Sequence, residues 1–260
     1  MTTYDDDLRL AHVLADAVER VTMARFRSQD LAVETKPDLT LVSDADRAAE
    51  ELIRSQLSRT RPRDAVVGEE FEPTGHGPRR WIVDPIDGTH NFVRGVPVWA
   101  TLIALVVAEG PVMGLVAAPA LGRRWWAAKG SGAYAGRSLT SATRIRTSGV
   151  QRLADASISL SSVTSWDAVG RTVAVLDLAR DCWRQRAYGD FWSYMLLAEG
   201  SVDIASEPEL ALYDMAALAP IVTEAGGRFT SLDGTDGVFG GNALATNGHL
   251  HDHVLERIGL

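Results

Sequence analysis

Cysteine, histidine and long apolar runs are all scarce in this chain. The single cysteine, Cys182, excludes an intrachain disulfide, as expected in a reducing cytoplasm, and we expect its thiol to be buried. The six histidines are dispersed, so a zinc site is poorly supported. The longest apolar run, residues 98–108, is interrupted by Thr101 and is too short to cross a bilayer. Residues 1–7 contain three consecutive Asp and no apolar core, so we expect no signal peptide.

An excess of positive charge is also missing. Asp and Glu total 34 against 26 Lys and Arg, which leaves a formal net charge of −8. Such a chain is poorly suited to nucleic acid or an anionic membrane as its main partner. Hydrophobic residues make up 46% and charged residues 23%, the usual mixture of a globular protein. Clustered carboxylates would still allow an anionic ligand to bind, if divalent cations held between them reverse the local field.

The hydrophobic pattern changes halfway along the chain. The first half predicts helices at 5–26 and 46–58, strands at 31–35, 65–68, 81–83, 98–107, 112–118 and 123–128, and a hairpin over 133–143. The second half predicts strands at 157–160, 183–186, 202–205 and 244–246, alternating with helices at 167–178, 190–198, 214–225 and 249–258. We therefore expect an α+β half, residues 1–145, and an α/β half, residues 146–260, that together form one compact unit.

Acidic residues gather at the ends of predicted elements. Glu69 and Glu70 end one strand, Asp84 and Asp87 follow the next, and Asp214 begins a later helix. Oxygen donors of this kind suit Mg²⁺ or Mn²⁺. On spacing alone each acid also has a plainer interpretation, because Asp commonly caps a helix and paired Glu residues commonly end a solvated loop. The pattern therefore indicates a cation site only if these acids converge in space.

The turn between the two aspartates has its own chemistry. Pro85 restricts the residue before it and removes one N–H, and Gly88 relieves the steric limits where the chain turns. Together they would hold the two aspartates toward one point, with the carbonyl of Ile86 facing the same way. The N–H groups of Gly88 and Thr89, at the start of a helix, would then donate to a phosphate oxygen.

Two segments resemble the signatures of the inositol-monophosphatase-like family. The first comprises residues 68–70 (Gly-Glu-Glu) and 81–92 (Trp-Ile-Val-Asp-Pro-Ile-Asp-Gly-Thr-His-Asn-Phe). The second comprises residues 213–217 (Tyr-Asp-Met-Ala-Ala) and 222–227 (Val-Thr-Glu-Ala-Gly-Gly). Both stand in the family's order, although His90 and Tyr213 replace a common Thr and the usual Trp. The resemblance implies a layered αβαβα sandwich of the sugar-phosphatase type and a magnesium-dependent phosphomonoesterase.

The resemblance also implies roles for individual residues. The family's metal ligands match Glu69, Asp84, the Ile86 carbonyl, Asp87 and Asp214, which would hold two or three Mg²⁺ ions, with Mn²⁺ as an alternative. Thr89 and Glu69 match the residues that orient and deprotonate the attacking water, and Asp44 matches the acid that hydrogen-bonds this threonine. Lys36 matches a residue on a mobile loop near the metals, and Glu70 would be an accessory acid. Inhibition by lithium and assembly as a homodimer are implied as well.

Substrate choice is expected to depend on the second half. The Arg-x-x-Gly-Asp-x-x-x-Tyr pattern of residues 186–194 resembles the branch of the family that hydrolyses histidinol phosphate. That substrate carries an ammonium and an imidazole, for which a carboxylate is the natural partner. Asp190 is our candidate for this contact, and Glu207 matches the family position that binds the organic part of the substrate. The plainer alternatives are a helix cap for Asp190 and a surface acid for Glu207.

These expectations combine into one functional hypothesis. The chain would be a cytoplasmic enzyme of histidine biosynthesis that hydrolyses L-histidinol phosphate, with a small phosphate ester as its partner. Hydrolysis of inositol 1-phosphate or fructose 1,6-bisphosphate is the alternative within the same class. A non-catalytic, metal-stabilised binding protein is the alternative from a different class. The tryptophans at 125–126 and 192 fit a dimer interface and a core equally well.

Overall fold

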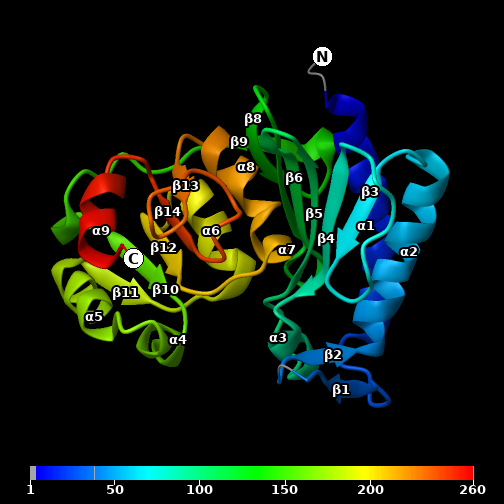
Figure 1. The fold of residues 1–260 in the computed structure, drawn as a ribbon, viewed down its shortest axis with the longest axis horizontal. Helices are drawn as coiled ribbons and strands as arrows, with labels where there is room; N and C mark the ends of the chain where they lie inside the picture. Colours follow the sequence, from blue (N-terminus) through cyan, green and yellow to red (C-terminus); the bar gives the residue numbers. More distant parts are fainter. Residues whose placement is uncertain (1–3, 38, 260) are drawn as a thin grey trace.

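A computed structural model describes residues 4–37 and 39–259, which form alternating layers of helix and sheet (Figure 1). Helices α1 (Asp5–Arg25) and α2 (Asp44–Thr60) cover the outer face of a seven-stranded sheet. Helices α6 (Asp190–Ala198) and α8 (Leu218–Glu224) lie between this sheet and a five-stranded sheet. Helices α5 (Thr172–Asp181) and α9 (His251–Ile258) cover the far face of the second sheet. This order of layers confirms the predicted αβαβα sandwich.

The seven-stranded sheet is formed by consecutive strands of the first half. In spatial order they are β3 (Ala65–Gly68), β4 (Arg80–Asp87), β5 (Ala100–Val107), β6 (Gly110–Ala118), β7 (Arg123–Ala128), β8 (Gly132–Gly136) and β9 (Ala142–Ile145). Strand β3 runs parallel to β4, and the other neighbouring pairs are antiparallel. Because side chains alternate along a strand, Trp125 packs against Phe191 of α6 and Trp126 against His12 of α1. Both tryptophans therefore belong to the core of the chain.

The five-stranded sheet is mixed. Its strands lie in the order β11 (Arg184–Arg186), β10 (Ser157–Leu160), β12 (Ile204–Glu207), β14 (Ala243–Thr246) and β13 (Arg228–Thr230). Strand β10 is parallel to β11 and β12, whereas β14 is antiparallel to both of its neighbours. We did not predict β13, because three residues directly after a glycine pair carry too little pattern to indicate a strand.

Two predicted helices are divided in the structure. The helix expected at 167–178 is α4 (Val163–Ala168) and α5, separated at Gly170, whose φ of 69° ends the first helix. The helix expected at 214–225 is α7 (Leu212–Met215) followed by α8. A hairpin of β1 (Val33–Thr35) and β2 (Leu41–Ser43) lies beside the short helix α3 (Thr89–Val93), and 3-10 turns occupy Pro119–Leu121, Leu139–Ser141 and Leu153–Asp155.

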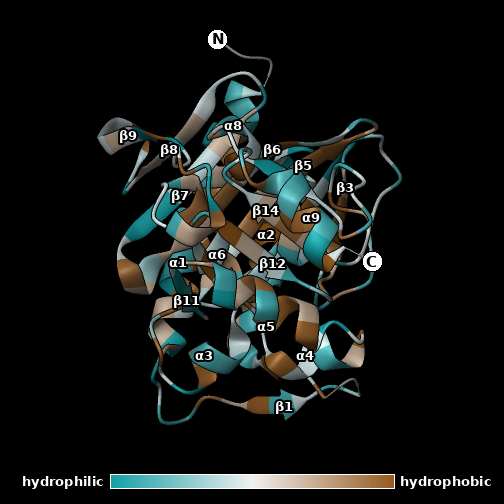
Figure 2. Cartoon of the chain, turned by 90° about the vertical axis from the view of Figure 1, so that its left-hand side faces the viewer, coloured by the Kyte–Doolittle hydropathy of each residue, from teal (hydrophilic) through white to brown (hydrophobic). Residues whose placement is uncertain are grey.

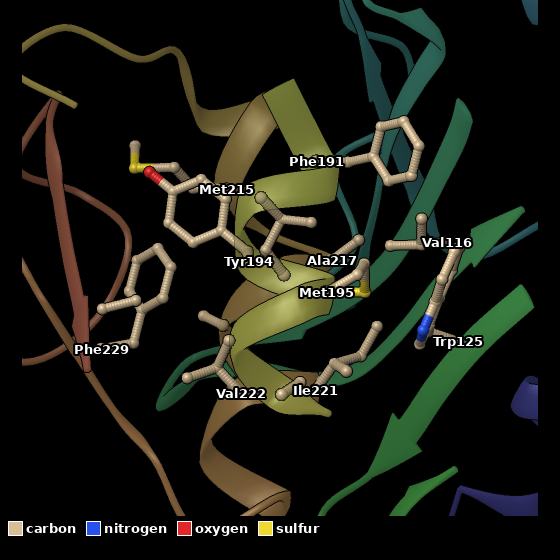
Figure 3. Packing of buried hydrophobic residues seen from close by; sticks show 14 of the residues in the cluster. Val116, Trp125, Phe191, Tyr194, Met195, Met215, Ala217, Ile221, Val222 and Phe229 are labelled. Carbon is tan, nitrogen blue, oxygen red and sulfur yellow. The ribbon is translucent and has the colours of Figure 1, made fainter. Parts of the chain in front are cut away.

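Apolar side chains fill the spaces between the layers. Figure 3 shows the central space, where Phe191 extends from α6 toward Val116 and Trp125, and Tyr194 extends to the other side, toward Phe229. Further apolar clusters lie under α1 and α2 and under α5 and α9. Figure 2 shows the outermost helix α9 with a mainly hydrophilic outer face. Each large side chain fully buried in this way contributes about 1.5–3 kcal/mol to folding.

Two smaller expectations are tested by the fold. The Cys182 thiol is only half-buried, so the expectation of a buried thiol was wrong. Across residues 4–37 and 39–259, no helix is both long enough and apolar enough to cross a membrane.

We predict that Gly114→Ala destabilises the protein, because α8 packs directly on β6 at this glycine. An added Cβ would lie 2.1 Å from the carbonyl oxygen of Ala217 and 2.9 Å from Pro220 Cγ. Overpacking of this kind costs about 1–3 kcal/mol, which lowers the melting temperature by about 3–10 °C in a chain of this size. Thermal denaturation measures the change. Gly149→Ala is the matched control, because a Cβ there meets nothing within 4 Å. Equal melting temperatures for the two variants would contradict the prediction.

Candidate metal centre

Asp84 and Asp87 belong to the same strand, β4, and both line one cavity. Side chains alternate along a strand, so residues three apart normally point to opposite faces. Strand β4 pairs Asp84 with Leu102 and Asp87 with Ala100, which leaves one more residue on β4 than on β5 between these pairs. Such a bulge shifts the alternation by one residue and turns both carboxylates to one side. The hydroxyl of Thr101 donates to the carbonyl of Pro85 within the bulge, at 2.8 Å.

A third acid, Asp214, reaches the same point from α7. One carboxylate oxygen each from Asp84, Asp87 and Asp214 lie within 4.8 Å of one another. Each of the three acids also accepts one backbone N–H, which leaves its other oxygen to face the cavity. The donors are the N–H groups of Ile86 at 3.0 Å, Phe191 at 2.7 Å and Ala211 at 2.7 Å. Asp214 therefore caps its helix and contributes to the acidic cluster at the same time.

Burial opposes the simultaneous ionisation of these three carboxylates. Burial raises the pKa of Asp84 well above its usual range, and the charges of Glu69 and Asp87 raise it further. Burial and the charges of Asp190 and Asp214 do the same to the pKa of Asp87. Burial raises the pKa of Asp214 to about 7, again with help from Glu69. A set of closely spaced anionic oxygens is the donor set that a hard divalent cation requires, so the residues fit Mg²⁺ or Mn²⁺.

Glu69 and Glu70 share the ammonium group of Lys36. Lys36 Nζ donates to Glu69 Oε1 at 2.8 Å and to Glu70 Oε1 at 2.7 Å. Burial lowers the pKa of Lys36, but these hydrogen bonds outweigh burial and raise it above its usual value. Burial raises the pKa of Glu70 to about 7 despite the contact with Lys36. The structure thus brings Lys36 and both glutamates to the edge of the acidic cluster.

Glu50 of α2, which we did not predict, holds this pair of glutamates in place. Its buried carboxylate accepts the backbone N–H of Glu70 at 2.7 Å and Nε of Arg54 at 2.7 Å. Arg54 in turn donates to the carbonyl of Phe71 at 2.9 Å. A Cβ on Gly68 would lie 2.0 Å from Glu50 Oε1, so glycine is needed for this close approach. The absence of any motif around Glu50 left the sequence silent on its role.

The expected hydrogen bond between Asp44 and Thr89 was wrong. Asp46 is the acid beside the threonine, with its Oδ1 3.4 Å from Thr89 Oγ1. Asp44 instead forms an ion pair with Arg25 at 2.6 Å and is partly exposed. The reason is the capping box of α2, in which Ser43 is the N-cap and Asp46 turns back to accept the Ser43 N–H at 2.8 Å. The pattern Ser-x-x-Asp was present in the sequence and would have identified Asp46.

Thr89 and Gly88 form the start of α3 beneath the acidic cluster. The Thr89 hydroxyl donates to the Ile86 carbonyl at 3.0 Å as an alternative to Asp46. Burial raises the pKa of Asp46 to about 6, although hydrogen bonds from Ser43 oppose the change. Gly88 has a φ of 83°, and a Cβ there would lie 3.0 Å from the Val98 carbonyl oxygen. Both the backbone angle and the close packing therefore require glycine.

Asp190 and Glu207 line the same cavity on its far side. Asp190 makes no capping hydrogen bond, so the helix-cap alternative was wrong; its Oδ2 accepts Asn91 Nδ2 at 2.9 Å. Glu207 Oε1 and Tyr194 Oη are buried and have no hydrogen-bond partner among the described residues. Burial and the charge of Asp190 raise the pKa of Glu207 to about 8, which the Tyr194 hydroxyl opposes. The surface-acid alternative for Glu207 is therefore wrong as well.

The cavity has a volume of about 240 Å³ and receives side chains from both sheets. Asp84, Asp87 and Thr89 come from the seven-stranded side, and Asp190 and Glu207 come from the other side. The sequence did not identify Asn91 or Tyr194, although Asn91 lies in the segment 81–92 and Tyr194 closes the pattern of residues 186–194.

Comparisons with known proteins agree on one relationship. A model of the inositol monophosphatase family matches residues 4–258. A histidinol-phosphatase of Streptomyces coelicolor is 65% identical over 98% of this chain and 97% of its own length. A histidinol-phosphatase of Mycobacterium tuberculosis is 55% identical over 97% of this chain and 98% of its own. Among solved structures, the IMPase of Thermotoga maritima superposes with a TM-score of 0.87 at 30% identity, covering 97% of this chain and 96% of that one.

We predict that Mg²⁺ stabilises the protein, and does so more strongly as pH rises. The pKa of Asp214 is raised from 3.8 to about 7, and the pKa of Glu207 from 4.5 to about 8. The folded protein therefore binds more protons than the unfolded chain across this window, and the metal-free protein loses stability as pH rises through it. Bound cations reverse the loss, and protons compete with them less at high pH.

Thermal denaturation in chelator and in excess Mg²⁺, at about pH 6 and about pH 8.5, measures both effects. At saturating Mg²⁺ we expect a gain of about 5–10 °C at the higher pH and a smaller gain at the lower. Asp214→Asn should reduce both the gain and its dependence on pH. An equal gain at both pH values would contradict the prediction.

Proposed function

Because the chain belongs to the inositol monophosphatase family, we propose that it hydrolyses L-histidinol phosphate to L-histidinol and phosphate, in histidine biosynthesis. One observation of the structure supports this substrate above the others. Two carboxylates outside the acidic cluster, Asp190 and Glu207, line the same cavity as the cluster itself. The relatives with 65% and 55% identity carry the name histidinol-phosphatase.

The substrate has two chemically different ends, and the cavity has two matching sides. The phosphate end is anionic and would lie over the acidic cluster once cations have reversed its charge. The ammonium and imidazole end would lie against Asp190 and Glu207. Glu207 Oε1 has no partner among the described residues, so an N–H of the substrate would satisfy a buried acceptor that otherwise costs about 1–3 kcal/mol. A neutral polyol such as inositol offers no cation to these carboxylates.

We assign the metal site to Glu69, Asp84, the Ile86 carbonyl, Asp87 and Asp214, with two or three Mg²⁺ as the working ions and Mn²⁺ as an alternative. Ions held there would neutralise the phosphate, lower the pKa of a bound water and stabilise the leaving alkoxide. The N–H groups of Gly88 and Thr89 would donate to the phosphate. Lys36 donates to Oε1 of Glu69 and of Glu70, which leaves Oε2 of Glu69 for a cation.

Thr89 and Glu69 would orient the attacking water and accept its proton. The Thr89 hydroxyl can act only if its own proton has an acceptor, and Asp46 and the Ile86 carbonyl are both in reach, at 3.4 Å and 3.0 Å. Asp46 is the better base of the two, because its carboxylate can carry the proton further. We therefore transfer to Asp46 the role that the resemblance implied for Asp44.

The remaining parts of the proposal concern cellular context. A biosynthetic phosphatase of this kind would work in the cytoplasm, and the family resemblance suggests a homodimer that is sensitive to lithium. The alternative activities remain hydrolysis of inositol 1-phosphate or fructose 1,6-bisphosphate. A non-catalytic binding protein is disfavoured, because the set Glu69, Asp84, Asp87, Thr89 and Asp214 is intact.

We predict a strong preference for histidinol phosphate in a phosphate-release assay with Mg²⁺. Its kcat/KM should exceed those of inositol 1-phosphate, fructose 1,6-bisphosphate and adenosine bisphosphate by at least about 100-fold, because a site with buried polar groups rejects ligands that leave them unpaired. Asp84→Asn should lose at least about 100-fold in kcat on every substrate. A preference for inositol 1-phosphate would refute the substrate but leave the metal centre standing, and a fully active Asp84→Asn would refute the metal centre.

We predict that Asp46→Asn lowers kcat by about 10–100-fold with little change in KM, the usual loss when a residue that orients a site is removed. Asp44→Asn is the matched control: it removes the same charge two residues away, where the side chain is 42% exposed and pairs with Arg25. The loss of a surface ion pair should leave kcat within about twofold. If the two variants have equal activities, Asp46 does not have the role in orienting Thr89 that is proposed for it.

A further inference from the structure

Asn91 joins the two sides of the cavity through its side-chain amide. It lies on α3, two residues after Thr89, and is half-buried. Its Nδ2 donates to the Val98 carbonyl at 2.9 Å and to Asp190 Oδ2 at 2.9 Å. An amide NH₂ has two protons in a fixed plane, so both bonds form at once and neither competes with the other. The Val98 bond thereby fixes the direction in which the second proton points.

Asp190 occupies a backbone conformation that needs support. Its φ of 49° lies in the left-handed region, which Asp adopts more readily than most residues but still at a cost relative to glycine. Its neighbour Phe191 donates its N–H to Asp87 Oδ2 at 2.7 Å. The start of α6 is therefore attached at two points, to the end of β4 through the backbone of Phe191 and to α3 through the carboxylate of Asp190.

The two oxygens of the Asp190 carboxylate have different surroundings. Oδ2 accepts from Asn91 and packs 3.2 Å from the position that a Cβ on Gly88 would take. Oδ1 accepts no hydrogen bond from any described residue. Because Asn91 holds Oδ2, the rotation of the carboxylate is fixed, and Oδ1 is the oxygen left for a ligand.

We propose that Asn91 is a positioning residue that orients Asp190 toward the cationic end of the substrate, and so sets the distance between substrate recognition and the acidic cluster. This assignment rests on the proposed function, since it needs a substrate with a cation to recognise. Asn91 follows Asp84 and Asp87 of the cluster within one short segment, so a substrate held by Asp190 has a fixed position relative to the site of hydrolysis. Aspartate at position 91 would not substitute, because a carboxylate has no proton to donate to either acceptor.

The test compares two substrates on the full-length enzyme loaded with Mg²⁺. Histidinol phosphate needs both sides of the cavity, whereas p-nitrophenyl phosphate has no cation and needs only the acidic cluster. For Asn91→Ala we expect KM for histidinol phosphate to rise by about 10–100-fold, the loss typical of a hydrogen bond to a charged group. We expect its kcat to stay within about threefold, and kcat/KM for p-nitrophenyl phosphate within about twofold, because the cluster is untouched.

Two further variants separate positioning from a structural role. Asp190→Ala should raise KM for histidinol phosphate at least as much, and adding Asn91→Ala to it should produce no further rise, because the two residues act through one contact. Val93→Ala, on the same short helix and without a contact to Asp190, should leave both substrates unaffected. If Asn91→Ala fails to fold, Asn91→Ser, which keeps one donor proton, carries the same comparison.

The outcomes are distinguishable. A parent enzyme without preference for histidinol phosphate would overturn the proposed function and this assignment together. A parent that prefers histidinol phosphate, with Asn91 variants that keep the preference or lose both substrates equally, would overturn the assignment of Asn91 alone. Additive effects of Asn91→Ala and Asp190→Ala would also overturn it, because they would show that Asn91 acts independently of Asp190.

Discussion

Repulsion between buried carboxylates is the constraint on which the rest of this site depends. Asp84, Asp87 and Asp214 bring one oxygen each within 4.8 Å, and burial raises the pKa of all three. Two unit charges 4 Å apart interact by about 4 kcal/mol at an effective dielectric constant near 20. One backbone N–H on each acid reduces this cost without removing it. A divalent cation held between the three carboxylates would offset the remaining repulsion. The burial of the acidic cluster is therefore the physical reason for a metal cofactor.

The reactive end and the recognition end of the cavity are built mainly by different sides of the molecule. The bulge in β4 and the start of α3 belong to the seven-stranded side and build the reactive end. The other side provides Asp190 at the start of α6 and Glu207 at the end of β12. At the cavity, the N–H of Phe191 donates to Asp87 and the amide of Asn91 donates to Asp190, so these two hydrogen bonds connect the reactive side with the recognition side.

The sequence predicted the layers and the acidic cluster well, because both leave local patterns. Alternating apolar residues indicated most strands, and the segment 81–92 resembled a long and specific signature. The sequence could not predict the features that depend on how one strand pairs with another. The bulge between Asp84 and Asp87 arises from pairing with β5, and the sequence of β4 alone does not specify it. Asp46, in contrast, was open to prediction, because the capping pattern Ser-x-x-Asp identifies it as the acid that turns back to the N-cap Ser43.

The hydrogen bonding of Glu207 bears on which substrate the cavity accepts. A buried acceptor without a donor destabilises a fold, and proteins rarely retain one. Glu207 Oε1 is in this condition, within the cavity that also holds Asp190. The neighbouring Tyr194 packs against Phe229 within the apolar core around α6. Under the proposed function an N–H of the substrate would donate to Glu207, and a ligand without an N–H at this position would not gain that hydrogen bond.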